Sequence, residues 1–377
     1  MQSNITVIIT DAKYRASLAA VRAAYEMGAD VVVTQTSPDT DIIPPSFYSK
    51  CVKRTVLFDC SADNYEKYLS ELIGLIREYD KPVIFPVGAK TMDLLAQSRE
   101  ELSEIADFVL PTKQALDFAN DKNRVRELAK SLSIKVPYTY KNNEDIKNFP
   151  VVVKPECGEK YGLTAAQRYV IAKNPEEYKN ALLKMSQYGE NTIVQEKIEG
   201  AGLGVSLLMN KDGRAVSALC HRRIREYPIS GGPSSCLESF YDESLVRQAE
   251  QLLSAIEYTG FAMVEFKGDG YLLEINPRVW GSFPMTYVAK SSFVSDYIRL
   301  SKGESVEHKL DNYEIGKKMN FVLSDLAACL SYVLHGKAGI AFSGICDIIF
   351  GRAVDGIYDK NDKKPFKAYL TGKFFNK

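Results

Sequence analysis

Two glutamates and an asparagine in a short hairpin are the strongest chemical signal in this sequence. Glu265 and Glu274 fall in two strand-like runs that are separated by a glycine-containing turn at 267–270. A loop this short directs both carboxylates to one face, and the two-residue period of a strand adds Asn276 to that face. Two carboxylates and an amide oxygen suit Mg²⁺, with phosphate oxygens as its remaining ligands. The alternative is an edge hairpin whose charges point to solvent.

Two cations extend this prediction. Arg278 follows Asn276 by two residues, so it shares the same face, where a guanidinium could hold a phosphoryl or carboxylate group through two hydrogen bonds. Lys154 follows the buried-type strand at 151–153, and a lysine at such an exit suits a phosphate. Gly158 begins a loop whose backbone N–H groups could fold over phosphates. Strands also end in lysine without any ligand.

Two weaker signals concern a nucleotide. Asp121 is a plausible N-cap, and Lys122 directly after it could reach phosphates, although a solvated lysine is commoner at a helix start. The segment 194–200 runs from a strand into a glycine turn, where Glu196 and the backbone could contact an adenine edge. An ordinary charged strand end has the same composition.

A basic segment at 221–228 leads into a glycine–serine loop at 230–235, which suggests an anion site for a carboxylate or an acyl phosphate. The alternative is an exposed basic strand and a flexible loop. The chain's one tryptophan follows the acidic motif and is assigned to the substrate, although a core position would explain it equally well. The predicted substrate-binding residues are Arg223, Arg225, Ser230, Gly231, Gly232, Ser234, Trp280 and Gly281.

The elements that position these residues follow two patterns. In the first third, apolar strands alternate with amphipathic helices, which predicts a doubly wound parallel sheet. No GxGxxG follows the first strand, but the carboxyl ends of such strands could still line a ligand crevice. The later chain is of the α+β type with antiparallel hairpins. The predicted strands are 5–9, 31–33, 82–86, 151–153, 192–194, 205–209, 215–220, 261–266 and 271–275, and the predicted helices are 13–27, 64–79, 124–131 and 319–334.

Composition excludes several classes of protein. The 377 residues contain 48 basic and 48 acidic side chains, so no strong field attracts nucleic acid or an anionic membrane. No apolar run is long enough for a membrane span, and the first ten residues lack the pattern of a secretory signal. The seven cysteines form no CxxC pair, which favours reduced thiols in the cytoplasm.

In this order, the motifs resemble those of the ATP-grasp superfamily over about residues 1–300. The likeness is strongest to short carbamoyl-phosphate-synthetase-like and D-aspartate-ligase-like proteins. It implies an α/β plus α+β chain: a Rossmann-like pre-ATP-grasp domain at 1–118, then a two-lobed ATP-grasp fold with a lid subdomain at 119–194 and a metal-binding subdomain at 195–310. A C-terminal extension at 311–377 would pack on the core. The matching segments are Asp121-Lys122, Val153-Lys154-Pro155, Gln195-Glu196-Lys197-Ile198, Glu265 and Glu274-Ile275-Asn276-Pro277-Arg278.

The resemblance also implies roles for individual residues. One departure concerns the ribose: where many relatives place an acid or a histidine, this chain has glycines at 202 and 204, and Glu199 is a possible substitute. The implied roles are ATP phosphates for Lys122, Lys154 and Gly158, adenine for Glu196, Lys197 and Ile198, Mg²⁺ or Mn²⁺ for Glu265, Glu274 and Asn276, and catalysis by Arg278 and Lys154 at the acyl phosphate.

The activity implied is that of a carboxylate–amine ligase that forms an acyl phosphate and releases ADP and phosphate. A lid at about 125–190 would close over the site and exclude water. The expected partners are a small or conjugated carboxylate and an amine acceptor, without nucleic acid or membrane, and the chain could form a homodimer. Two alternatives stay open: activation of bicarbonate or carbamate, which the lack of a biotinyl or glutaminase domain disfavours, and a non-catalytic nucleotide-binding module.

Overall fold

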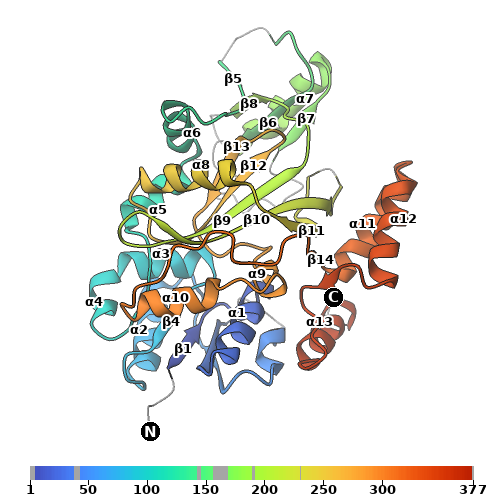
Figure 1. Ribbon diagram of the computed structural model, residues 1–377. Helices are drawn as coiled ribbons and strands as arrows, with labels where there is room; N and C mark the ends of the chain where they lie inside the picture. The colour runs from blue at the N-terminus through green and yellow to red at the C-terminus, as the bar shows by residue number, and fades with distance from the viewer. Residues whose placement is uncertain are drawn as a thin grey trace.

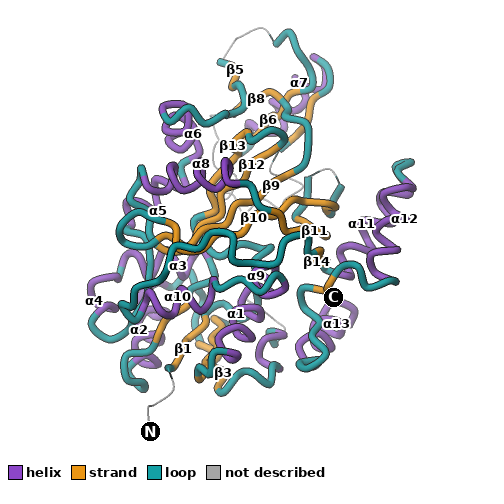
Figure 2. The backbone as a smooth tube through the Cα atoms, in the orientation of Figure 1, coloured by secondary structure: helices purple, strands orange, loops and turns teal. Residues whose placement is uncertain are grey.

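The computed structural model describes residues 5–37, 43–141, 146–155, 169–188, 192–229 and 231–375. In these residues the chain builds three sheets, which are stacked along the molecule in Figure 1 and traced in orange in Figure 2. Gly158 and Ser230, two of the predicted site residues, lie outside the described ranges. Within those ranges, no helix combines the length and the apolar character that crossing a bilayer requires.

The first sheet is parallel, with the strand order β3-β2-β1-β4. The side chains of Val7 and Ile8 point to opposite faces, and both are fully buried because α1 covers one face and α2 the other. Sequence patterns missed β3, an edge strand whose residues are mostly exposed. The elements are β1 (Thr6–Ile9), α1 (Arg15–Glu26), β2 (Asp30–Thr36), η1 (Pro45–Tyr48), β3 (Arg54–Phe58), α2 (Tyr65–Ile76), β4 (Val83–Phe85), α3 (Ala89–Gln97) and α4 (Arg99–Ser103).

Two helices, α5 (Lys113–Asn120) and α6 (Lys122–Ser131), connect the first sheet to the next part of the chain. Asp121 is the N-cap of α6, as predicted: its carboxylate accepts hydrogen bonds from the backbone N–H groups of Asn123 and Arg124, both at 3.0 Å. This cap begins the helix two residues earlier than predicted and places Lys122 in its first turn.

The small sheet is antiparallel, with the order β5-β8-β6-β7 and α7 packed on one face. Along β6, Val151 and Val153 point to that covered face, whereas Lys154 is less buried and points to the other. The elements are β5 (Thr139–Tyr140), β6 (Val151–Pro155), β7 (Val170–Ala172), α7 (Pro175–Ser186) and β8 (Thr192–Glu196).

The large sheet has seven strands in the order β13-β12-β9-β10-β11-β14-β15. Helix α8 covers one face, and the other face packs on the first sheet, where Leu208 and Phe261 share a core with Val33 and Phe85. The elements are β9 (Gly202–Met209), β10 (Ala215–Glu226), β11 (Ser234–Phe240), α8 (Glu243–Ser254), β12 (Gly260–Lys267), β13 (Tyr271–Asn276), α9 (Pro284–Val288), α10 (Phe293–Ser301), β14 (Lys318–Asn320) and β15 (Val354–Asp355).

The last part of the chain contributes to the fold more than expected. The predicted helix at 319–334 is wrong at its start, because Met319 and Asn320 belong to β14, which pairs with β11. The remaining helices are α11 (Val322–Leu334), α12 (Ala338–Ile349) and α13 (Lys364–Phe375). Figure 1 shows α11 and α12 as a hairpin that projects from the body of the molecule. The domain boundaries at 118, 194 and 310 remain predictions.

Candidate functional site

The acidic hairpin is formed by β12 and β13. Glu265 and Glu274 lie directly opposite each other in the antiparallel pair, so their side chains share a face, as predicted. Asn276 joins them, because its Nδ2 donates a hydrogen bond to Glu265 Oε1 at 3.0 Å. Burial and the neighbouring Glu274 raise the pKa of Glu265, while Arg223 and the Asn276 hydrogen bond oppose the shift. The hairpin thus concentrates negative charge where little solvent can disperse it.

Two lysines from other elements meet this hairpin. Lys122, in the first turn of α6, places Nζ 2.7 Å from Glu274 Oε2. Lys154 stands near the end of β6, and burial together with Lys122 lowers its pKa to about 8, with Glu274 acting in the opposite direction. The structure therefore brings Lys122, Lys154, Glu265, Glu274 and Asn276 together from three separate parts of the chain.

This set of donors fits a hard divalent cation that arrives with phosphate. The Nδ2 group of Asn276 donates its hydrogen bond to Glu265. The amide oxygen of Asn276 takes no part in that bond and can serve as a ligand. In the described ranges, no three His, Cys, Asp or Glu side chains gather into a metal-binding group. Two carboxylates and one amide do not complete an octahedral shell, so Mg²⁺ here would take phosphate oxygens as its other ligands.

Sequence reasoning missed His221 as a neighbour of the site. Gly204 on β9 pairs with both Glu265 and His221, so the three positions form one row across the sheet. A Cβ on Gly204 would overlap the His221 ring, which therefore lies over the strand and contacts Ser282 Oγ at 3.2 Å through Nε2. Burial, followed by Arg223, lowers the pKa of His221 to about 3, so the ring is neutral at physiological pH. The signal in the sequence is the i, i+2 pair of glycines at 202 and 204, because a glycine leaves room for a large side chain over the strand.

Arg223 lies close enough to the acidic hairpin for its charge to oppose the raised pKa of Glu265. Three hydrogen bonds hold its guanidinium: Nε donates to Ser234 Oγ at 3.0 Å, and Nη1 donates to Glu226 at 3.0 Å and to the Gly232 carbonyl at 3.1 Å. Of the predicted anion-binding segment, Arg223 and Ser234 are therefore close to the site.

The glycines of the same loop do not offer the predicted N–H groups. The backbone N–H groups of Gly231 and Gly232 both donate to the carbonyl of Pro228, at 3.2 and 2.7 Å. A Cβ on Gly231 would overlap the hydroxyl of Tyr169, the residue directly before β7. The loop therefore lies against the small sheet. These N–H groups are used inside a tight turn, and this corrects the prediction that they bind a substrate carboxylate.

Arg225 also departs from its predicted substrate role. A β-bulge between Arg223 and Arg225 turns Arg225 to the opposite side of β10 from Arg223. Its side chain is 1% exposed; Nε and Nη2 donate to Asp325 at 2.9 and 2.8 Å, and Nη1 donates to Asp347 at 2.9 Å. Because two buried aspartates occupy this guanidinium, Arg225 holds α11 and α12 on the sheet instead.

Trp280 is likewise a core residue rather than a substrate contact. It is 1% exposed, and its ring packs edge-on against Phe283, Phe293 and Phe261 at centroid distances of 5.3, 5.9 and 6.4 Å. Burying so large an apolar side chain is favourable, and this accounts for the position of Trp280 between the two sheets. Arg278 is half-buried just beyond β13, where its Nη1 donates to the Val279 carbonyl at 3.1 Å.

The residues predicted to bind adenine lie in the connection from β8 to β9. Glu196 Oε1 accepts a hydrogen bond from the backbone N–H of Tyr138 at 2.8 Å, and Lys197 pairs with Glu199. Ile198 packs against Gly268 in the β12–β13 turn. This connection therefore joins the small sheet to the large sheet beside the acidic hairpin.

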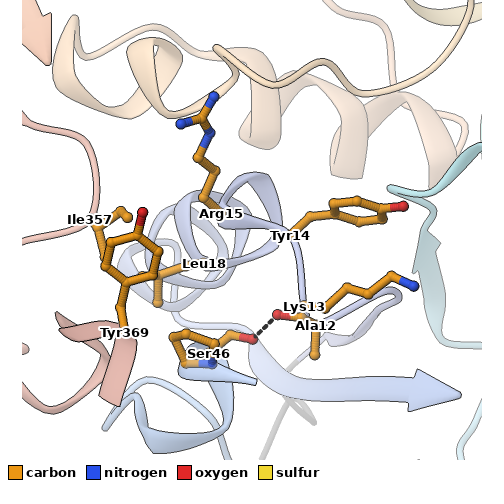
Figure 3. Close-up of a pocket in the computed structure, with 9 residues that line it drawn as sticks. Ala12, Lys13, Tyr14, Arg15, Leu18, Ser46, Ile357 and Tyr369 are labelled. Atoms are coloured by element: carbon orange, nitrogen blue, oxygen red, sulfur yellow. Dashed lines mark hydrogen bonds between the residues drawn. The ribbon is translucent and has the colours of Figure 1, made fainter. Parts of the chain in front are cut away.

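A cavity of about 230 Å³ opens at the carboxyl end of β1, in agreement with the expected crevice. The loop after β1, η1 and α13 surround it, and Figure 3 shows Tyr369 and Ile357 at the left, Ser46 below and the Arg15 side chain extending upward. Arg15 Nε donates to the Gly281 carbonyl at 2.9 Å, and its guanidinium stacks 3.4 Å from the ring centroid of Phe321. Burial lowers the pKa of Arg15 to about 10. The cavity is thus linked to the segment that follows the acidic motif.

The chain is similar to several known proteins. Residues 119–282 match the family model described as the ATP-grasp domain. The chain is 27% identical over 172 residues to D-alanine–D-alanine ligase of Fusobacterium nucleatum, which covers 41% of this chain and 55% of that protein. It is 25% identical over 272 residues to D-aspartate ligase of Enterococcus faecium, covering 63% and 64%. The chain thus spans between about half and two thirds of the length of these two relatives.

Solved structures show the same fold. Biotin carboxylase from Campylobacter jejuni, in complex with beta-gamma-ATP, superposes with a TM-score of 0.61 at 14% identity. The match covers 84% of this chain and 74% of that protein. At this identity the likeness concerns the fold alone, a mixed α/β architecture.

Proposed function

We propose that this chain, which matches the ATP-grasp domain over residues 119–282, is an ATP- and Mg²⁺-dependent ligase of the ATP-grasp type that joins a carboxylate to an amine. One observation carries the proposal: Lys122, Lys154, Glu265, Glu274 and Asn276 come from α6, β6 and the β12–β13 hairpin, yet they form one cluster of complementary charge. Such a cluster suits the triphosphate of ATP, which carries both negative charge and a divalent cation.

The chemistry we propose needs positioning and charge compensation more than covalent work by the protein. A carboxylate oxygen of the substrate attacks the γ-phosphorus, the bond to the ADP oxygen breaks, and an acyl phosphate results. A neutral amine then attacks the acyl carbon, phosphate leaves, and the amine gives up its proton. When bound through Glu265, Glu274 and Asn276, Mg²⁺ would supply further compensation of the phosphoryl charge.

The residues of the chain have separate tasks in this scheme. Lys122 and Lys154 hold the phosphates, because each is a cation directed at the acidic hairpin where the metal would lie. Arg223, fixed by its three hydrogen bonds, and Arg278 steady the acyl phosphate. Glu196, Lys197 and Ile198 contact adenine, and the connection from β8 to β9 acts as the hinge on which the small sheet closes over the nucleotide as a lid.

We also propose that the cavity beside Arg15 holds the organic part of a substrate. Arg15 lines the cavity, and burial lowers the pKa of its guanidinium, while Tyr369 and Asp355 act in the opposite direction. A carboxylate in the cavity would offset this burial. A cavity of about 230 Å³ suits a small metabolite or one end of a conjugated one.

The cysteines support a cytoplasmic location for this reaction. The six in the described ranges are free thiols, and five of them are buried. Unpaired cysteines persist in a reducing compartment, where ATP is also available.

The test is ATP turnover with Mg²⁺ against amino acids and other small carboxylates, singly and in pairs with amines, with ADP and phosphate as readouts. Hydroxylamine is added in parallel, because it converts an acyl phosphate to a stable hydroxamate. Hydroxamate formation that requires a carboxylate supports the ligase. Turnover with bicarbonate alone supports the carboxylase or carbamoyl-phosphate alternative, and ATP binding without turnover by any substrate supports a binding module.

A further inference from the structure

The outer surface of the α11–α12 hairpin is apolar to an unusual degree. Nine large apolar side chains in residues 326–350 are between 40% and 75% exposed. At about 200 Å² for one fully accessible large side chain, these exposures amount to roughly 1,000 Å². The largest apolar patch of a typical monomer measures only about 300–600 Å². The hairpin therefore presents a surface that needs a partner.

The exposed residues follow the spacing of helices that pack on other helices. On α11, Leu326, Leu330 and Val333 recur at i, i+4 and i+7. On α12, Phe342 and Ile349 recur at i and i+7, with a further exposed isoleucine between them. The inner stripes of the two helices are already buried on each other and on the sheet. Each helix therefore has a second apolar stripe, which is the pattern of a helix with neighbours on two sides.

The hairpin is held rigidly in this orientation. Arg225 on β10 bonds to Asp325 of α11 and to Asp347 of α12, with all three side chains almost fully buried. Gly344 allows close packing, because a Cβ there would overlap Cys329 Sγ of α11. An interface on a rigid element requires little ordering when it binds, which favours association.

The charge pattern distinguishes between possible partners. Between Val322 and Ile349 the charged side chains are Asp325 and Asp347, which are buried on Arg225, and Lys337 in the turn. Helices that lie in a membrane surface typically carry a row of Lys and Arg along the polar face, and α11 and α12 have none. A neutral apolar face instead matches a second copy of itself, since no like charges meet across a two-fold axis.

We propose that two copies of this chain associate through the outer faces of their α11–α12 hairpins and form a four-helix bundle across a two-fold axis. The roughly 1,000 Å² of exposed apolar surface exceeds the about 800 Å² per partner of a standard interface. The proposal concerns assembly and does not depend on the proposed reaction.

The experiment is sedimentation velocity of the full chain from about 1 to 100 μM, a range that brackets micromolar dissociation constants. The wild type is expected to be a dimer. Leu330→Glu and Leu334→Glu should each raise the dimer dissociation constant about 100-fold or more, because both copies bring a charge into the apolar bundle. Leu183→Glu on α7 is the matched control: Leu183 and Leu334 are both leucines with 75% exposure, and this variant should remain a dimer.

Thermal unfolding of the variants separates loss of assembly from loss of folding, because these positions are exposed and their monomers should stay folded. A wild type that is monomeric at about 100 μM would overturn the proposal. So would a dimer that survives both Leu330→Glu and Leu334→Glu. Monomers that co-sediment with phosphatidylcholine–phosphatidylglycerol vesicles, and lose this binding in the two variants, would assign the hairpin to a membrane instead.

Discussion

Lys122 Nζ lies 2.7 Å from Glu274 Oε2, and this ion pair ties the first turn of α6 to the strand that carries the acidic pair. Both side chains keep about a quarter of their surface accessible, so the pair can open to a ligand. In the proposed reaction, Lys122 would pair with phosphate oxygens instead, and Glu274 would become a ligand of Mg²⁺. The pair therefore keeps the two groups beside each other until a metal–triphosphate complex separates them.

Replacing Glu274 with glutamine tests the metal assignment. Glu274→Gln should lower ADP formation on the order of 100-fold or more, because one of two charged ligands is lost. Affinity for Mn²⁺ in the presence of ATP, followed by electron paramagnetic resonance, should fall with it. Glu243→Gln, which removes an exposed glutamate paired with Arg247 on α8, is the control and should leave both readouts unchanged. Wild-type turnover by Glu274→Gln would refute the assignment.

The lowered pKa of Lys154 predicts a pH dependence of ATP binding. Its pKa of about 8, compared with 10.5 for an ordinary lysine, means that the cation is lost as the pH rises through 8. We expect KM for ATP to rise above pH 8, and ATP binding near that pH to take up protons, measurable by calorimetry in buffers of different ionisation enthalpy. Lys154→Arg retains its charge over this range and should flatten the profile.

The same shift has an opposite sign for stability. Between pH 8 and 10.5 the unfolded chain binds a proton at this lysine that the folded chain has released, so this group makes folding more favourable as the pH rises. Weaker ATP binding above pH 8 in a protein whose urea unfolding midpoint does not fall would therefore assign the effect to Lys154. A KM that is independent of pH would contradict it.

Arg225 and Arg222 lie on the same strand and should behave differently. Arg225→Ala leaves Asp325 buried without its cation and leaves Asp347 with Lys318 alone, so it should lower the free energy of unfolding by about 3–5 kcal/mol. Arg222→Ala removes a half-exposed pair with Glu238 and should lower it by less than about 1 kcal/mol. Urea denaturation measures both. A substrate role for Arg225 would appear instead as a raised KM without loss of stability.

The cavity beside β1 is tested through Arg15. Arg15→Met keeps most of the side chain's length but removes the charge, and it should raise KM for the carboxylate substrate about 10-fold or more while KM for ATP stays within about two-fold. Arg54→Met, at an exposed pair with Glu78 on the same sheet, is the control. Equal changes in both KM values would show that Arg15 acts on the fold and not on the substrate.

The acidic site was largely predictable because its geometry is local. A short turn places Glu265 opposite Glu274, and the period of a strand adds Asn276, so neighbouring residues along the chain define the face. Capping is equally local, and Asp121 therefore predicted the helix start that carries Lys122. The alternation of strands and helices likewise predicted the parallel first sheet.

Other assignments failed where a contact between distant segments decides the outcome. Arg223 and Arg225 have the same spacing as two residues on one face, but a bulge set by the pairing of β10 with β11 separates them. Trp280 is buried because the first sheet covers it, and Met319 is in a strand because β11 offers an edge. Residue type and local period contain no information about these partners.

By itself, then, the sequence determined which residues could form the acidic cluster and its cations, since turn length, capping and strand period act between near neighbours. Only the tertiary structure decided that Lys122 and Lys154 reach that cluster. It also decided that Arg225 pairs with two buried aspartates and that the α11–α12 hairpin keeps an uncovered apolar face. The physical reason is that burial and charge pairing depend on which distant segments meet, and that is a property of the packed chain as a whole.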